Sequence, residues 1–368
     1  MTLAIHGFGL AVSKTAVDQE QAWAMASRIA CRTEEDRAWL RLMFEQTGIR
    51  SRHIHFSEIV VEDLIEGTRQ SDSVFLPRLP DDGAGPTTAQ RMQAYHGEAT
   101  HLAIQSCRQA LRVSDVKPSE ITHLVTVSCT GFAAPGVDCE LIDNLKLSPD
   151  IARTNVGFMG CHGALNGLRV AKAYAESDSS AKVLLCATEI CSVHFHYGWE
   201  PQKLVANALF ADGSAALVAS SEARKPSWHL VANGSYIVPD SANAMSWSIV
   251  DHGFEMTLSK QVPAIIATNL RPWLVEWLAK LNMRIEQIAN WVVHPGGSRV
   301  LQIVQESLEL SPDHLEASRE VFAEYGNMSS PTVLFILERL ARKQARGACV
   351  AMAFGPGMTI EAAYLEFR

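Results

Sequence analysis

An internal repeat of strand and helix patterns constrains the fold of this 368-residue sequence more than any other feature. Two apolar, β-type runs that begin at Ile121 and Ala181 recur in the second half at the same distance of 167 residues (288 − 121 and 350 − 183). The glycine-flanked segments at Cys161 and Asn327, each followed by a helix pattern, lie 166 residues apart (327 − 161). Any two strand–helix–strand units resemble each other, but agreement among three offsets favours a duplication.

The repeat predicts an α/β fold built from two related halves. Short β-rich runs alternate with helix patterns along most of the chain, which is typical of α/β proteins. We expect the halves to span residues 1–222 and 223–368. Cys161 and Asn327 would then begin equivalent helices and could face each other across one crevice.

Composition places the chain among ordinary globular enzymes. Hydrophobic residues make up 47% and charged residues 20%, and the net charge of −8 argues against nucleic acid as a partner. We expect no membrane insertion, because no apolar run is long enough to span a bilayer. The N-terminus lacks a basic region and a cleavage site, so we predict a cytoplasmic protein. In that reducing compartment the eight cysteines would mostly be core thiols.

Cys161 lies in the segment Gly157-Phe-Met-Gly-Cys-His-Gly, between a strand pattern and a helix pattern. An apolar stripe at helical spacing from Ala164 to Ala175 predicts that helix. A cysteine at a helix N-terminus lies at the positive end of the helix dipole, which lowers the pKa of its thiol. A small residue at a crowded turn would give the same pattern, so the segment alone leaves the role of Cys161 open.

His294 and Asn327 indicate a catalytic site only in combination with Cys161. Alone, a histidine at the end of a buried strand is more often a core residue, and Asn327 could be a helix N-cap. Together the thiol can carry an acyl group, while the two nitrogen-bearing side chains can stabilise an enolate oxygen. This chemistry requires no metal or redox cofactor. Papain-like hydrolases also use Cys, His and Asn, so residue types alone do not separate condensation from hydrolysis.

Four motifs occur in the order and spacing of type III polyketide synthases, the chalcone-synthase-like enzymes of the thiolase superfamily. The motifs are Gly160-Cys-His-Gly, His294-Pro-Gly-Gly, Tyr325-Gly-Asn-Met-Ser-Ser and Phe354-Gly-Pro-Gly-Met-Thr. The sequence resembles this family, in its bacterial form, from the first strand to the C-terminus. The resemblance implies a thiolase-like, five-layered αβαβα fold and a homodimer. It also implies acyl-coenzyme A starters, extension with malonyl-coenzyme A, and no cofactor beyond these substrates.

The resemblance also assigns roles to individual residues. Cys161 would be the nucleophile, with His294 and Asn327 activating it and driving decarboxylation. Phe210 corresponds to the gatekeeper between the coenzyme A tunnel and the cavity, and Met256 stands where a second gatekeeper phenylalanine would be.

Several cavity positions depart from the plant pattern. Trp247 stands where chalcone synthases have a glycine, which predicts a smaller cavity and a shorter or redirected product unless the indole only packs in the core. The histidines of His194-Phe-His196 have metal-like spacing, but no third ligand cluster accompanies them, so we predict no metal. The other expected cavity residues are Cys129, Cys191, His194 and Ser329. Cys129 resembles a second cysteine of tetrahydroxynaphthalene synthases, and an inert buried thiol is the simpler interpretation.

Arginines are the candidates for binding the phosphates of coenzyme A. Arg299 begins a predicted helix, where phosphates bind well. The N-terminal region offers Arg41 and Arg50, together with Arg37 and Arg52. Each of these arginines could equally be a solvated surface charge.

Two alternative functions remain open at this point. A ketoacyl synthase III-like enzyme would share the three catalytic residue types, although His294 is followed by Pro-Gly-Gly rather than the Gln-Ala-Asn of that family. A non-catalytic homologue could bind acyl-coenzyme A or polyketides. A thiolase would need a second catalytic cysteine, and Cys349 lies inside a predicted strand. For a synthase, the changed cavity residues favour an alkylpyrone or alkylresorcinol product.

Overall fold

The computed structural model describes residues 2–77, 84–223 and 226–368. The strands are β1 (Leu3–Ala11), β2 (Thr15–Asp18), β3 (Ser51–Ile54), β4 (His123–Ser128), β5 (Ala152–Gly157), β6 (Lys182–Ile190), β7 (Asp212–Ser220), β8 (Trp228–Ile237), β9 (Met245–Val250), β10 (Gly253–Leu258), β11 (Asn290–Val293), β12 (Ala348–Gly355) and β13 (Thr359–Phe367). The α-helices are α1 (Gln19–Ala30), α2 (Glu34–Glu45), α3 (Glu58–Glu66), α4 (Thr88–Ser114), α5 (Val137–Leu145), α6 (Gly163–Ser177), α7 (Pro201–Leu209), α8 (Val262–Ala279), α9 (Ser298–Leu308), α10 (Glu316–Tyr325) and α11 (Thr332–Arg342).

The main sheet has nine strands in the order β11-β12-β13-β8-β1-β7-β6-β4-β5, and its two halves repeat one topology. In the first half β1, β7 and β6 are successively antiparallel, and β6 then pairs with β4 in parallel. In the second half β8, β13 and β12 are antiparallel, and β12 then pairs with β11 in parallel. This equivalence confirms the predicted duplication, with β5 as the strand that the second half lacks. The halves join where β1 pairs with β8.

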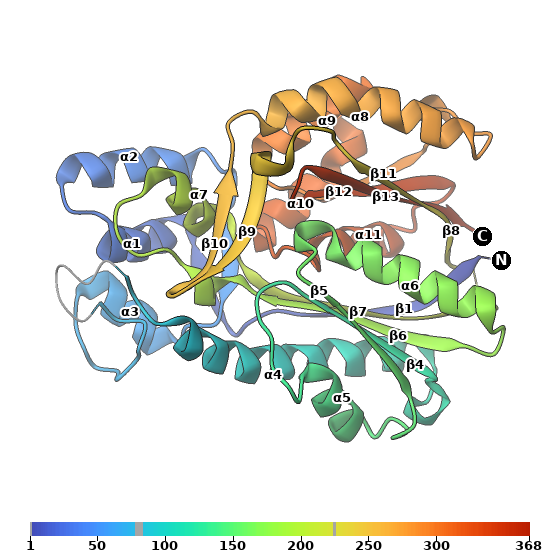
Figure 1. The fold of residues 1–368 in the computed structure, drawn as a ribbon, viewed down its shortest axis with the longest axis horizontal. Coiled ribbons are helices and arrows are strands. Elements are labelled where there is room, and N and C mark those ends of the chain that lie inside the picture. The colour runs from blue at the N-terminus through green and yellow to red at the C-terminus, as the bar shows by residue number, and fades with distance from the viewer. Residues whose placement is uncertain (1, 78–83, 224–225) are drawn as a thin grey trace.

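The elements form five layers, as predicted for the thiolase-like α/β fold (Figure 1). Helices α8 and α9 cover one outer face, α4 and α5 cover the other, and α6 and α11 lie between the two halves of the sheet. The chain passes between the halves after β7, in a connection that includes residues 224 and 225, which lie outside the described part of the chain. The division at residues 222 and 223 therefore stays a prediction.

The strands are apolar on both faces because helices cover both of them. Val127 of β4 and Ala351 of β12 point into the central layer, where Leu168 of α6 lies. Leu124 of β4 and Met352 of β12 point the other way, toward the outer helices. Side chains on a strand alternate between its faces, so one strand serves two cores. Burying an alkyl side chain of this size contributes about 1.5–3 kcal/mol, and Leu168→Ala should cost about 2–5 kcal/mol of stability.

Two parts of the chain differ from the expected pattern. The helix expected to start at Asn327 begins only at Thr332, after Pro331. A proline disfavours helical backbone in the residue before it, so the segment from 326 to 330 stays outside the helix. The hairpin of β9 and β10, which pairs Trp247 with Met256, was not predicted. No helix in the described residues is long and apolar enough to cross a membrane.

Candidate active site

Cys161 lies in η2 (Gly160–His162), a 3₁₀ turn that leads directly into α6. Phe158 and Gly160 have φ angles of 60° and 70°, so the chain reverses sharply before the thiol. A Cβ atom on Gly160 would lie only 2.5 Å from Cδ of Pro356. The Phe354-Gly-Pro-Gly motif therefore packs directly against the turn that presents the cysteine.

The thiol of Cys161 is protonated at neutral pH. Burial raises its pKa to about 11, and the nearby Glu189 carboxylate acts in the same direction. Hydrogen bonds from Ser329 and Asn327 oppose this rise but do not cancel it. The expectation that the helix dipole lowers the pKa of Cys161 is therefore wrong, because loss of water around the sulfur outweighs the dipole of α6.

His294 directly follows β11, and its backbone N–H donates to Met352 O at 2.9 Å. The side chain is 1% exposed, and neither ring nitrogen has a hydrogen-bond partner among the described residues. Burial, assisted by the neighbouring His162, lowers the pKa of His294 to about 3. The ring is therefore neutral at neutral pH, with one N–H donor and one acceptor available to a substrate.

Asn327 is held in a short extended segment beside the end of α7. Its backbone N–H donates to Leu209 O, and its carbonyl accepts from the N–H of Ala211, both at 2.9 Å. Its side-chain Oδ1 accepts from the N–H of Ser329 at 2.8 Å. Because the oxygen is used in this way, the Nδ2 group is left to donate, and it does so toward Cys161. Asn327 is thus a fixed donor rather than the N-cap of α11.

The three predicted catalytic residues line one entrance pocket of about 430 Å³. Most of its wall is apolar and comes from α7, β10 and α8, with Phe210 and Met256 at its inner end. Two exposed cations, Lys260 and Arg299, also line it, and the sequence had indicated only Arg299. This pocket brings Cys161, His294 and Asn327 together, whereas the duplication had predicted only that Cys161 and Asn327 face one crevice.

The N-terminal arginines do not line the entrance pocket. Arg41 pairs with Glu45 at 3.0 Å on the exposed side of α2, and Arg50 lies 3.9 Å from Glu324. Arg52 is buried under the end of α7. Sequence could not separate these arginines, because their neighbours come from distant segments.

An inner cavity of about 40 Å³ lies beyond Phe210 and Met256. All but one of the expected cavity residues line it, namely Cys129, Cys191, Phe210, Trp247, Met256 and Ser329. The indole Nε1–H of Trp247 donates to Cys129 O at 2.7 Å, which fixes the ring against the cavity. Trp247 therefore lines this cavity and does not simply pack in the core.

Cys129 is a neutral thiol in the same cavity wall. Its Sγ lies 3.3 Å from Glu189 Oε1 and 3.4 Å from Ser329 Oγ. Burial raises the pKa of Cys129, and the Glu189 carboxylate raises it further. The backbone N–H groups of Cys129 and Thr130 also donate to Glu189, so this buried carboxylate organises the whole segment.

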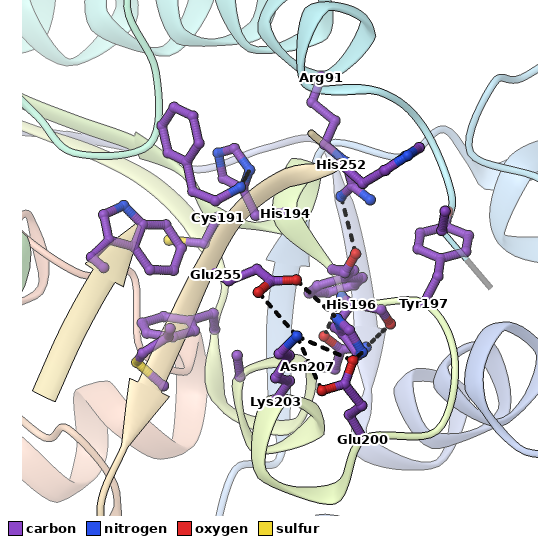
Figure 2. A pocket seen from close by; sticks show the side chains of 17 residues that line it. Arg91, Cys191, His194, His196, Tyr197, Glu200, Lys203, Asn207, His252 and Glu255 are labelled. Carbon is purple, nitrogen blue, oxygen red and sulfur yellow. Dashed lines mark hydrogen bonds and ion pairs between the residues drawn. The ribbon is translucent and has the colours of Figure 1, made fainter. Parts of the chain in front are cut away.

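His194, the remaining expected residue, lines a second chamber of about 200 Å³ that shares Cys191, Phe210, Trp247 and Met256 with the inner cavity (Figure 2). Its Nε2–H donates to Thr130 O at 2.7 Å, and its Nδ1 accepts from the N–H of Phe254 at 3.0 Å. The ring stacks on Phe254 and meets the Trp247 indole edge-on. Burial lowers its pKa to about 3. His194 thus braces the tryptophan with both ring nitrogens in use.

The outer part of this chamber is charged. Lys203 lies within 3.1 Å of both Glu200 and Glu255, and His196 lies beside the same two carboxylates (Figure 2). The Lys203 ammonium group pairs with both carboxylates, whereas burial lowers the pKa of His196 and leaves its ring uncharged at neutral pH. In the described part of the chain no group of three His, Cys, Asp or Glu side chains is arranged to hold a metal ion.

Comparison with known proteins places this site in a family. Residues 2–223 match the N-terminal domain of chalcone and stilbene synthases, and residues 229–367 match the C-terminal domain. The fold is similar to the crystal structure of PKS-I from the brown alga Ectocarpus siliculosus, with a TM-score of 0.92. The two sequences are 30% identical, and the match covers 100% of this chain and 98% of that chain. The fold is also similar to the crystal structure of the C-terminal type III polyketide synthase domain of Steely1, a type I/III hybrid from Dictyostelium, with a TM-score of 0.88. The two sequences are 26% identical, and the match covers 100% of this chain and 99% of that chain.

A curated relative, "Probable polyketide synthase 1" of Dictyostelium discoideum, is 27% identical over 98% of this chain. The chain spans only 11% of the length of that relative. The bacterial subtype stays a prediction. The match over both domains and the shared architecture establish that the chain belongs to the chalcone and stilbene synthase family of type III polyketide synthases.

Proposed function

We propose that this protein loads an acyl group onto Cys161, extends it by decarboxylative condensation with malonyl units, and cyclises the product. The observation that carries the proposal is the entrance pocket, where a thiol, a neutral histidine without hydrogen-bond partners among the described residues, and an oriented asparagine amide meet. Cys161, His294 and Asn327 are its catalytic residues.

Acyl loading needs a base, because the thiol of Cys161 is protonated at rest. The neutral His294 ring can accept the thiol proton as the sulfur attacks the thioester carbonyl. The acyl group then moves to the sulfur of Cys161, and the coenzyme A thiolate leaves and takes up a proton. The apolar walls exclude water, which protects the new thioester from hydrolysis.

Decarboxylation needs donors for the developing enolate. When malonyl thioester loses CO₂, the electrons of the broken C–C bond pass into the thioester carbonyl. The free N–H of His294 and the Nδ2–H of Asn327 can donate to that oxygen. The carbanion then attacks the acyl carbon, forms the new C–C bond and releases the Cys161 thiolate.

We propose acyl-coenzyme A and malonyl-coenzyme A as substrates. Lys260 and Arg299 support this proposal, because cations at the edge of an otherwise apolar pocket suit a phosphate group with a long flexible arm. A homodimer is proposed as well. Strand β5 is an exposed edge of the main sheet, and the exposed Phe132 lies against it, which together offer a surface for a second copy.

The small inner cavity supports a small starter and few extensions. With about 40 Å³ beside Cys161, a growing chain meets the Trp247 indole early. Of the two product classes, the alkylpyrone fits this limit better, because a pyrone ring closes after fewer extensions than a resorcinol ring.

The proposal can be tested with malonyl-coenzyme A that carries ¹⁴C in its free carboxyl group and with acetyl-, hexanoyl-, palmitoyl- and benzoyl-coenzyme A starters. We expect release of ¹⁴CO₂ and short pyrones from the smaller starters, identified by mass spectrometry, and none from Cys161→Ala. A single linear ketoacyl product would instead indicate a ketoacyl synthase III-like enzyme. Binding without CO₂ release or product from any starter would indicate a non-catalytic homologue.

A further inference from the structure

Arg52 in β3 is buried beneath the turn that carries the gatekeeper Phe210. The residue is 1% exposed. Its Nη1 donates to Asn207 O at 2.7 Å and to Phe210 O at 3.0 Å. These carbonyls lie at the C-terminal end of α7, where orphan backbone acceptors and the negative end of the helix dipole favour a cation.

The same turn holds the catalytic asparagine. Leu209 and Ala211, on either side of Phe210, make the two backbone hydrogen bonds to Asn327. Gly326, directly before Asn327, packs on the arginine, since a Cβ there would lie 3.4 Å from Arg52 Cβ. Arg52, Phe210 and Asn327 thus belong to one hydrogen-bonded unit made from three distant parts of the chain.

Stability alone does not explain a cation at this place. Nε and Nη2 of Arg52 have no hydrogen-bond partner among the described residues. The nearby Asp212 carboxylate is itself buried and accepts from the N–H and the Oγ–H of Ser192. A buried, partly satisfied charge stabilises a fold weakly or not at all compared with an apolar side chain.

We propose that Arg52 is a positioning residue for catalysis, which fixes the Phe210 ring between the entrance pocket and the inner cavity and keeps the Asn327 amide directed at Cys161. It touches no substrate and acts only through the backbone of the turn. The inference rests on the proposed condensing function, because it assigns Arg52 to the geometry of that reaction.

Arg52→Met keeps the length and volume of the side chain but removes both hydrogen bonds. We expect kcat for condensation to fall about tenfold to a hundredfold, because small displacements of reacting groups have effects of that size. The KM for malonyl-coenzyme A should change little, since Lys260 and Arg299 are untouched. Arg52→Lys retains one cationic donor group and should recover part of the lost rate.

Arg319→Met is the matched control. Arg319 in α10 is partly buried and also donates to a backbone carbonyl, that of Pro312 at 2.9 Å, and to Gln305 Oε1, but it lines neither the entrance pocket nor the inner cavity nor the second chamber. This variant can lose stability, but it should not show the kcat loss at constant KM. Thermal unfolding of each variant, measured beside its kinetics, corrects the rates for the folded fraction.

The inference would be overturned if folded Arg52→Met had the kcat of the wild type. It would also be overturned if Arg52→Lys were no more active than Arg52→Met. An equal kcat loss in Arg319→Met would also overturn it, since the effect would then be general. Failure of the proposed function looks different, because the unmodified protein would itself release no ¹⁴CO₂ and form no product.

Discussion

In the N-terminal half of the molecule the chain enters its central helix through a tight turn that directs a buried thiol into the entrance pocket, whereas in the C-terminal half the equivalent chain stays extended. Cys161 lies directly before α6, and Asn327 pairs with the turn at Phe210 before α11 begins. The two halves share one sheet topology, but they carry different functional groups. In the proposed function, the first half supplies the covalent attachment, and the second half supplies Asn327 and His294 as donors.

The comparison shows how one architecture yields two complementary contributions. The helices that follow the two segments, α6 and α11, both lie in the central layer (Figure 1), and the side chains of Cys161 and Asn327 meet in one pocket. In the first half the equivalent position carries Cys161 at the start of a helix. In the second half the residues before α11 stay outside the helix, and backbone hydrogen bonds hold Asn327 there as a donor. Each prediction below separates these contributions or measures what surrounds them.

Loss of the nucleophile should have the largest effect. Cys161→Ala should abolish acyl adducts and product, because Cys161 is the one cysteine among the described residues that lines the entrance pocket, while alanine fits the small site without unfolding the protein. Intact-mass spectrometry after incubation with an acyl-coenzyme A tests this. Cys129→Ala is the control and should still be loaded. An acyl adduct on Cys129 in the Cys161→Ala variant would contradict the division of roles.

Removal of the donor in the second half should leave loading intact. In Asn327→Ala we expect adducts on Cys161 but a fall in ¹⁴CO₂ release of about 10²–10³, the usual cost of one oxyanion donor. His294→Ala should lose both steps, because the ring also accepts the thiol proton. Equal loss of loading and decarboxylation in Asn327→Ala would show that the halves do not act separately.

The reactivity of Cys161 should rise steeply with pH. A pKa raised to about 11 means that the neutral thiol dominates below that value, so the thiolate fraction grows about tenfold per pH unit through the neutral range. The rate of alkylation by iodoacetamide, followed from pH 7 to 9 by peptide mass spectrometry, should rise by about that factor. A rate independent of pH would reveal a preformed thiolate–imidazolium pair spanning the two halves.

Enlargement of the inner cavity should change the product more than the rate. Trp247→Gly removes the indole and its hydrogen bond to Cys129 O, so we expect longer products from the same starter. Trp247→Phe keeps most of the bulk and should keep the product length. Identical chromatograms for the wild type and the glycine variant would show that the indole does not limit chain growth.

The smallest effect is expected at the pocket edge. Arg299→Ala should raise the KM for malonyl-coenzyme A by up to about fivefold at constant kcat, because exposed charge pairs contribute about 1 kcal/mol or less. Arg41→Ala and Arg50→Ala should change neither constant, since those side chains point elsewhere. A raised KM in Arg41→Ala but not in Arg299→Ala would indicate that the phosphates bind at α2.

Much of the fold could be predicted because the duplication left local patterns that repeat at one offset. Strands β4, β6, β11 and β12 and helix α6 lie close to where those patterns predicted them. The start of α11 was missed because Pro331 and the left-handed Ser329 override the helix pattern. The β9–β10 hairpin was missed although a strand signal was present. Met245-Ser-Trp-Ser-Ile and Phe254-Glu-Met-Thr-Leu both alternate between apolar and polar residues, as strands do.

The sequence by itself determined the family and the architecture and singled out Cys161, His294 and Asn327 as the proposed catalytic residues, since these depend on residue types in a fixed order. Only the tertiary structure decided the protonation of Cys161, the size of the cavity behind Trp247 and the place of Arg52 under the turn. Burial and hydrogen bonding between distant segments set these properties. No local pattern records them, because each depends on which residues the fold brings together.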